Sequence, residues 1–202
     1  MIRLTRYGVV LRQLDVDDLE KVRIWRNGPD VMQYMAHREY ITPAMHERWY
    51  AGVRERGDLY FMICQDGQDV GVINLKEIDL CAGEAEGGIF MAREELCSTL
   101  TPFRASMCIL DFGFEVLRLK RKRVHVLDGN GRSIRFCTTL GYRPTQILVN
   151  GSCRRYYLER DDYYNHTLPR LQRVLEQPLL PTLTATSSPG PSAPRAHAET
   201  LK

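Results

Sequence analysis

Short apolar runs and longer segments with helical spacing follow one another along the first 176 residues. Runs bounded by turn residues predict strands, and segments with capping signals and apolar residues three or four apart predict helices. The predicted strands are Val9–Leu14, Leu59–Gln65, Val70–Ile78, Glu86–Met91, Val124–Leu127, Gln146–Val149 and Arg154–Glu159. The predicted helices are Asp17–Trp25, Asp30–Met35, Pro43–Arg56, Pro102–Leu117, Ser133–Leu140 and Leu168–Leu175. This alternation predicts an α/β fold.

A threonine followed by a proline gives the clearest helix starts in the chain. Thr42-Pro43 and Thr101-Pro102 each combine a capping side chain with a residue preformed for the first turn. The basic run Arg118–Arg123 fills the end of the second of these helices, where the helix dipole favours cations. We interpret the run as a solvated helix end, with binding of nucleic acid or of an adenosine 3′-phosphate as the alternative.

A strand–loop–helix–strand unit is predicted at the centre of this layout. The strand Val124–Leu127 leads through a turn at Asp128–Gly131 into a helix that Gly141 ends. Such a unit brings a helix N-terminus to the open end of the strands, where anionic ligands bind.

The last 26 residues, 177–202, differ from the rest of the chain because they hold five of its ten prolines among Thr, Ser and Ala. This composition buries too little apolar surface to offset the entropy of ordering. We predict one domain over residues 1–176 and a disordered tail over 177–202.

Charge and cysteine usage exclude several classes of protein. The 28 Lys and Arg against 25 Asp and Glu leave a net charge of +3, too small for bulk nucleic-acid binding. No apolar run approaches the ~18 residues of a membrane span, and Met1–Arg6 lacks the apolar core of a signal peptide. The six cysteines form no CxxC pair and accompany no histidine cluster, so we expect no metal site and no disulfide framework. These features predict a cytoplasmic protein without membrane or nucleic-acid partners.

Three segments resemble the GNAT N-acetyltransferase superfamily, and within it the RimJ/RimL-type branch. They are Trp25–Asp30, Ile41–Pro43 with His46, and Asn130–Phe136 followed by Leu140–Tyr142. The resemblance spans roughly residues 8–165 and is greatest to amino-sugar-nucleotide N-acetyltransferases of pseudaminic-acid pathways. It implies a twisted, mixed but mainly antiparallel sheet that is flanked by helices and splays open between its fourth and fifth strands.

The resemblance implies that acetyl-CoA is the cosubstrate and lies in this splay. Its pantetheine arm would pair with the fourth strand, and its pyrophosphate would rest on the loop before the long helix. The cofactor-binding residues implied are Ile89, Phe90, Met91, Ser98, Thr99, Leu100, Thr101, Asn130, Ser133 and Phe136. The family's loop contains glycines that this chain lacks, so the hydroxyls of Ser98, Thr99 and Thr101 either replace those phosphate contacts or only cap the helix.

Acetyl transfer to an amine uses a neutral nucleophile, a donor for the oxyanion and a proton donor for the departing thiolate. A backbone amide near Phe90 or Met91 would serve the oxyanion. Cys137 stands where many relatives carry the tyrosine that acts as acid, and an ordinary thiol pKa of about 8.5 suits that role. His125 on the fifth strand is the candidate base. The alternative for both residues is a purely structural place in the core.

Acceptor-binding candidates are Arg26, His46, Lys76 and Glu86. The planar guanidinium of Arg26 suits a phosphate, and the alternative is a cap on its own helix. His46 either contacts the acceptor or is a solvated helix residue. Because side chains alternate along a strand, only one of Lys76 and Glu77 is expected to face the cleft. Glu86, like Glu84, would hold an incoming ammonium or lie at a solvated strand end.

These observations favour an acetyl-CoA-dependent N-acetyltransferase that acts on a small primary amine, preferentially an amino sugar carried on a nucleotide. One alternative is transfer to a protein N-terminus or an antibiotic amine. Another is a non-catalytic GNAT-fold binding module whose CoA loop has degenerated. A homodimer is left open.

Overall fold

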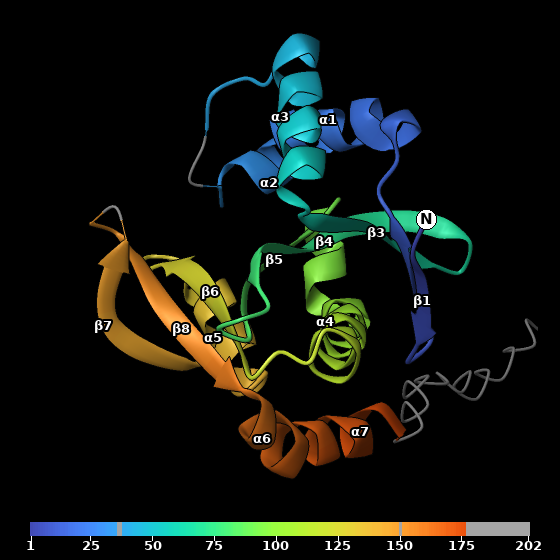
Figure 1. Cartoon of the computed structure of the whole chain (residues 1–202). Coiled ribbons are helices and arrows are strands. Elements are labelled where there is room, and N and C mark those ends of the chain that lie inside the picture. The colour runs from blue at the N-terminus through green and yellow to red at the C-terminus, as the bar shows by residue number, and fades with distance from the viewer. Residues whose placement is uncertain (36–37, 150, 177–202) are drawn as a thin grey trace, which may run out of the picture.

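An eight-stranded sheet runs through the middle of the computed structural model, which describes residues 1–35, 38–149 and 151–176 (Figure 1). The strands are β1 (Arg3–Arg6), β2 (Val9–Gln13), β3 (Leu59–Gln65), β4 (Gln68–Asp79), β5 (Glu84–Met91), β6 (Arg121–Leu127), β7 (Arg143–Val149) and β8 (Cys153–Glu159). The helices are α1 (Leu19–Asn27), α2 (Pro29–Met32), α3 (Pro43–Arg56), α4 (Thr101–Asp111), α5 (Gly131–Thr139), α6 (Arg160–Asp162) and α7 (Leu168–Glu176).

The strand order is β1-β2-β3-β4-β5-β6-β8-β7. Every neighbouring pair is antiparallel except β5 and β6, which run parallel. The predicted mixed, mainly antiparallel sheet flanked by helices is therefore confirmed. The strand β1 was not predicted, because it is a short, mostly exposed edge strand with little apolar signal.

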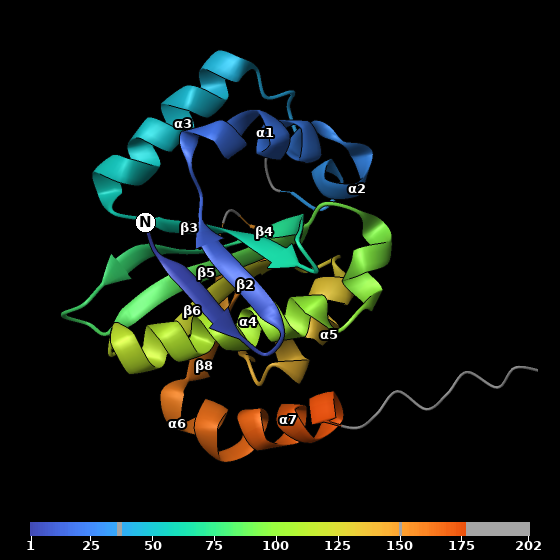
Figure 2. The same ribbon diagram turned by 90° about the vertical axis from the view of Figure 1, so that its right-hand side faces the viewer.

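Helices cover both faces of the sheet in two layers. Helices α1, α2 and α3 lie on one face, while α4 and α5 lie on the other, with α6 and α7 beneath α4 (Figure 2). Thr42 caps α3 by accepting a hydrogen bond from the backbone N–H of Met45, and Asn130 caps α5 by accepting one from Ser133. The predicted helix start at Thr42-Pro43 is confirmed, whereas α5 begins at Gly131 rather than at the predicted Ser133. Thr101, predicted as a cap, is instead the first residue of α4, and its N-cap residue Leu100 makes no side-chain cap hydrogen bond.

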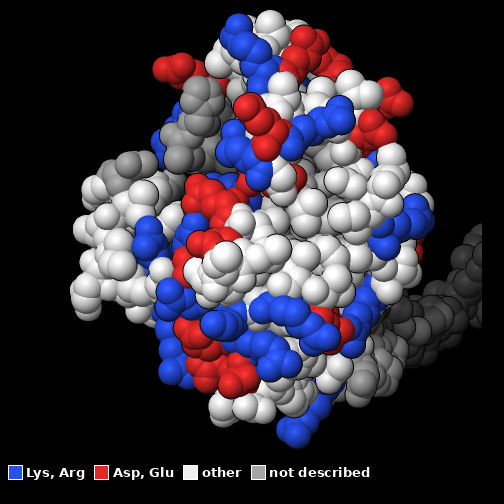
Figure 3. Space-filling view, in the orientation of Figure 1, with Lys and Arg blue, Asp and Glu red and all other residues white. Residues whose placement is uncertain are grey.

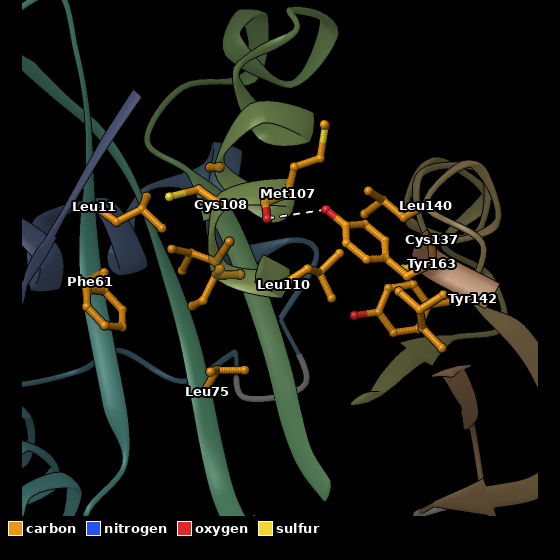
Figure 4. Packing of buried hydrophobic residues seen from close by; sticks show 14 of the residues in the cluster. Leu11, Phe61, Leu75, Met107, Cys108, Leu110, Cys137, Leu140, Tyr142 and Tyr163 are labelled. Atoms are coloured by element: carbon orange, nitrogen blue, oxygen red, sulfur yellow. Dashed lines mark hydrogen bonds between the residues drawn. The ribbon is translucent and has the colours of Figure 1, made fainter. Parts of the chain in front are cut away.

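The core is centred on α4, whose side chains Ala105 to Asp111 are all buried. Tyr163 packs beneath this helix and donates a hydrogen bond to the backbone oxygen of Met107 (Figure 4). Its hydroxyl also reaches Asp111, which accepts a second hydrogen bond from Tyr7 at 2.7 Å. Burial raises the pKa of the Asp111 carboxyl, so these donors stabilise a charge that the core would otherwise disfavour.

The basic run is not a helix end, and this interpretation was wrong. Helix α4 gives way to a π-helical turn at Phe112–Val116, and the chain reverses at Arg118, whose φ is +58°. Residues 121–123 then form the start of β6. The guanidiniums of Arg121 and Arg123 each lie 2.6 Å from the Glu84 carboxylate, so ion pairing within the sheet accounts for these two members of the run.

The surface of the described residues carries both basic and acidic side chains. Basic and acidic side chains are interleaved on the face shown in Figure 3. Within the described ranges, no helix is both long and apolar enough to cross a membrane. The predicted tail at 177–202 lies outside the described residues.

We predict that Tyr163→Phe lowers the free energy of unfolding by about 1–2 kcal/mol, because Asp111 loses one of its buried donors. Urea unfolding followed by circular dichroism measures this change. Tyr164→Phe is the matched control, since the Tyr164 hydroxyl bonds the exposed Glu115. Equal effects of the two substitutions would contradict the role given to the buried hydroxyl.

Candidate active site

The site is built around the point where β5 and β6 separate. The two strands pair only through Glu84–Glu86 and Arg121–Arg123. Beyond that point β5 continues along β4 as far as Met91, whereas β6 stays paired with β8 along its whole length. The opening holds a cavity of about 680 Å³. The predicted splay between the fourth and fifth predicted strands is thus present, between β5 and β6.

The wall that β5 contributes is a free strand edge. From Gly87 onward β5 has a partner only on its β4 side. Backbone groups of a strand point alternately to its two sides, so those that point toward the cavity lack a strand partner. An extended ligand can satisfy them by hydrogen bonding along β5.

Ten of the predicted site residues line this cavity. They are Arg26, Lys76, Glu86, Ile89, Phe90, His125, Asn130, Ser133, Phe136 and Cys137. They come from α1, β4, β5, β6 and the start of α5, which shows that segments distant in sequence meet in the splay. Met91, His46 and Ser98–Thr101 do not line it.

The segment Ser98–Thr101 has local hydrogen bonds typical of a helix start. Thr99 donates its hydroxyl hydrogen to the backbone oxygen of Leu96 at 2.8 Å and accepts from the N–H of Thr101 at 3.3 Å. The buried hydroxyl of Thr101 bonds Gln65. These contacts with Leu96, Thr101 and Gln65 occupy the two threonine hydroxyls without a ligand.

Glu86 is the centre of a charged cluster on one side of the cavity. It is buried, and its carboxylate lies 2.6 Å from Lys76 Nζ, 3.1 Å from His125 Nδ1 and 3.8 Å from Arg123 Nε. Arg155 donates from Nε to His125 Nε2 at 3.1 Å. Since a guanidinium only donates, His125 Nε2 is the acceptor and Nδ1 carries the hydrogen. Neither ring nitrogen then has a free lone pair with which to take a proton.

Lys76 and Glu77 both line the cavity, so the expectation that only one of them faces it was wrong. The φ of Glu77 is +49°, and the β4–β5 register shifts between Lys76 and Asp79. This irregularity interrupts the alternation on which the expectation rested.

Arg26 projects from α1 toward the cavity, and no acidic residue in the described part of the chain forms an ion pair with it. Its guanidinium lies 5.9 Å from the Phe90 ring centre, and its Nε is buried with no hydrogen-bond partner. Burial lowers its pKa. In the described ranges its Nε donates to no carbonyl, so this atom does not cap α1.

His46 lies away from the cavity. Its ring stacks on Trp49 with centroids 4.8 Å apart, and it is only 4% exposed. Burial lowers its pKa, which favours a neutral ring. The alternative of a solvated helix residue was therefore wrong.

Lys122 was missed in the sequence because it lies within the basic run. It is 5% exposed and lines the cavity from the β6 face that also carries Val124 and Val126. A Cβ at Gly87 would come within 2.5 Å of its Nζ, so the glycine leaves the space that this side chain occupies. Burial lowers the pKa of Lys122 to about 7. Lys122 is spaced two and four residues from Val124 and Val126, and this alternation along a strand is the sequence signal that predicts an inward-facing lysine.

Residues 9–143 match the model of the acetyltransferase (GNAT) domain family. The chain belongs to this family. GNAT enzymes use acetyl-CoA, and we conclude that the protein is an acetyltransferase.

Two curated relatives extend the comparison. Spermidine N(1)-acetyltransferase of Escherichia coli K12 is 27% identical over 154 residues, covering 73% of this chain and 82% of that protein. Acetyltransferase PseH of Campylobacter jejuni strain 81-176 is 25% identical over 136 residues, covering 67% of this chain and 80% of that protein.

Solved GNAT structures share the fold. Spermidine N-acetyltransferase from Vibrio cholerae, in complex with CoA and spermine, superposes with a TM-score of 0.68 at 21% identity and covers 78% of this chain and 99% of that one. A domain from Methanocaldococcus jannaschii gives a TM-score of 0.66 at 21% identity, covering 75% and 97%.

Cys137, which was predicted to stand at the GNAT tyrosine position, is a buried thiol, and burial changes its acidity. Cys137 is 7% exposed, and burial raises its pKa to about 12. Because the Cys137 thiol is so weak an acid, proton transfer from it to a thiolate of pKa about 8.5 has an unfavourable free-energy change. The premise that Cys137 has an ordinary thiol pKa was therefore wrong.

We predict that the free energy of unfolding of the wild type, measured relative to that of the Lys122→Met variant, increases between pH 7 and pH 10. The pKa of Lys122 lies near 7 in the folded state and at 10.5 in the unfolded chain. Between these values the unfolded state binds more protons, so the difference grows by up to about 1.4 kcal/mol per pH unit. Urea unfolding of both proteins from pH 6 to pH 10 measures it. A difference that does not change with pH would contradict the lowered pKa.

Proposed function

We propose that this GNAT enzyme transfers the acetyl group of acetyl-CoA to a primary amine of a small molecule, and that the preferred acceptor is a nucleotide-linked amino sugar. The observation that carries the proposal is the cavity between β5 and β6, which joins a free strand edge to a charged pocket. It offers room for a thioester and an amine at the same point.

The donor would lie along the β5 edge. Ile89, Phe90 and Met91 supply the backbone for the pantetheine arm, and the amide of Phe90 or Met91 would donate to the oxyanion. From α5, Asn130, Ser133 and Phe136 would contact the same arm. We place the pyrophosphate near Ser98, Thr99, Leu100 and Thr101, at the start of α4. In this placement, backbone N–H groups would donate most of the hydrogen bonds to the pyrophosphate, because the hydroxyls of Thr99 and Thr101 already have partners.

The acceptor would approach from the Glu86 side of the cavity. Attack of its neutral nitrogen on the carbonyl carbon needs the loss of one proton, and we propose His125 as the group that accepts it. This requires Arg155 to release His125 Nε2. An anionic group on the acceptor would make that exchange favourable, because it would replace the imidazole as the partner of Arg155.

Charge pairing favours an anionic acceptor over a polyamine. The carboxylates that line the cavity are already engaged, Glu86 by Lys76 and Glu77 by Arg123. Among the residues that the structure describes, the Nε of Arg26 has no hydrogen-bond partner. A buried cation without a counter-charge is costly, and a phosphate on the acceptor would relieve that cost.

A polyamine is the second candidate acceptor. It is favoured by the 27% identity to spermidine N(1)-acetyltransferase. A protein N-terminus and an antibiotic amine remain further alternatives of the RimJ/RimL type, while a binding module would bind CoA without turnover. A homodimer stays a prediction; one structure of the Vibrio cholerae relative is dodecameric.

We predict that Arg26→Met raises the KM for a nucleotide-linked amino sugar at least tenfold, because a charged hydrogen bond to phosphate contributes about 1.5–3 kcal/mol. The assay measures CoA release with acetyl-CoA and either UDP-glucosamine and related uridine-diphosphate amino sugars or spermidine. Lys21→Met, which removes an exposed cation from the same helix, is the control.

Turnover with spermidine alone would replace the amino-sugar proposal by the polyamine one. Calorimetry with acetyl-CoA separates the remaining outcomes. Binding without turnover on any amine would indicate a binding module, and the absence of binding would refute the enzyme proposal.

A further inference from the structure

Lys122 is a buried cation without a structural partner. Its Nζ reaches across the splay to Gly87 of β5, at the point where β5 and β6 separate. Within the described part of the chain, no carboxylate forms an ion pair with it, and the one ionisable group that acts on it is Cys137. Leu158, its register partner on β8, is apolar. A methionine would fill this place without the desolvation cost, so packing alone does not explain a lysine.

The position of Lys122 within the cavity connects it to the reaction. Cys137, near the C-terminal end of α5, also lines the cavity and stands where many GNAT relatives have the tyrosine that protonates the departing sulfur. Cysteine is much shorter than tyrosine and leaves space there. Lys122 enters the same part of the cavity from the opposite wall, the β6 strand.

We propose that Lys122 is the proton donor to the CoA sulfur when the thioester is cleaved. This inference rests on the acetyltransferase function proposed above. The acceptor nitrogen attacks the carbonyl carbon, the C–S bond breaks, and its electron pair goes to sulfur. The Lys122 ammonium gives a proton to this sulfur, producing the CoA thiol and a neutral amine. The proton that the acylated nitrogen loses returns to Lys122 through His125 or water, so the cycle balances without a further reactant.

The acidity of the two candidate donors supports Lys122. A lysine with a pKa of about 7 protonates a thiolate of pKa about 8.5 with a favourable free-energy change. The buried Cys137 thiol, whose pKa is about 12, does so only unfavourably. Tyr142 also lines the cavity, and burial raises its pKa well above the ordinary value, which makes its hydroxyl a poor proton donor.

The test compares the wild type with Lys122→Met, using acetyl-CoA and whichever of the uridine-diphosphate amino sugars or spermidine the wild type acetylates fastest. We expect kcat to fall about 100-fold, a typical value for loss of an acid catalyst, with the Kd of acetyl-CoA by calorimetry within about twofold. Lys120→Met is the matched control, because Lys120 is exposed and belongs to the same basic run. It should keep wild-type kcat.

The pH dependence separates a proton donor from a structural residue. The ratio of wild-type to Lys122→Met kcat should fall as pH rises from 6 to 9, because wild-type Lys122 loses its proton over this range. Because both proteins use the same acceptor, the effect of protonating the acceptor amine cancels in this ratio. Cys137→Ala should reduce kcat by no more than about tenfold, below the usual range for an acid catalyst.

Three results would overturn the inference. They are an unchanged kcat in Lys122→Met, a kcat ratio independent of pH, and a stable acetyl group on Lys122 found by mass spectrometry after incubation with acetyl-CoA. Thermal unfolding of each variant shows whether it is folded. A wild type that transfers acetyl to no amine would instead refute the proposed function, and the inference with it.

Discussion

The short parallel pairing of β5 with β6 is the constraint on which the site depends. Each strand is held along its outer side by an antiparallel partner, β4 for β5 and β8 for β6. These two ladders diverge after three residue pairs, and right-handed sheet twist makes such divergence a natural outcome. The result is a strand edge inside the protein rather than at its border. An unpaired edge in that place is costly unless a ligand uses it.

Charge placement around the opening follows from this geometry. On one face of β6, Arg123 and His125 meet the carboxylates of β4 and β5, which neutralises that wall. On the other face, Lys122 lies beside Cys137 of α5 and Gly87 of β5. Arg26 enters from the helical layer above. These two side chains, for which no carboxylate among the described residues forms an ion pair, therefore reach one cavity from different elements, in keeping with separate roles toward the acceptor and the leaving sulfur.

The sequence predicted the fold well because the strands and helices carry regular apolar spacing and strong caps. Arg26, His125 and Cys137, which were predicted as site residues, line one cavity. The errors came from tertiary effects that local patterns do not contain. Arg121–Arg123 resembled a helix end because their carboxylate partners lie about forty residues earlier in the chain. The positive φ of Glu77 and the changed acidity of Cys137 likewise depend on packing by other elements.

Amide hydrogen exchange of β5 tests most directly whether the splay is the acetyl-CoA site. The account predicts that CoA slows exchange at residues 87–91, where the edge lacks a partner, and leaves Val9–Gln13 of β2 unchanged because both of its sides are paired. Protection confined to other elements at a saturating CoA concentration, with β5 exchanging as fast as in the free protein, would contradict it.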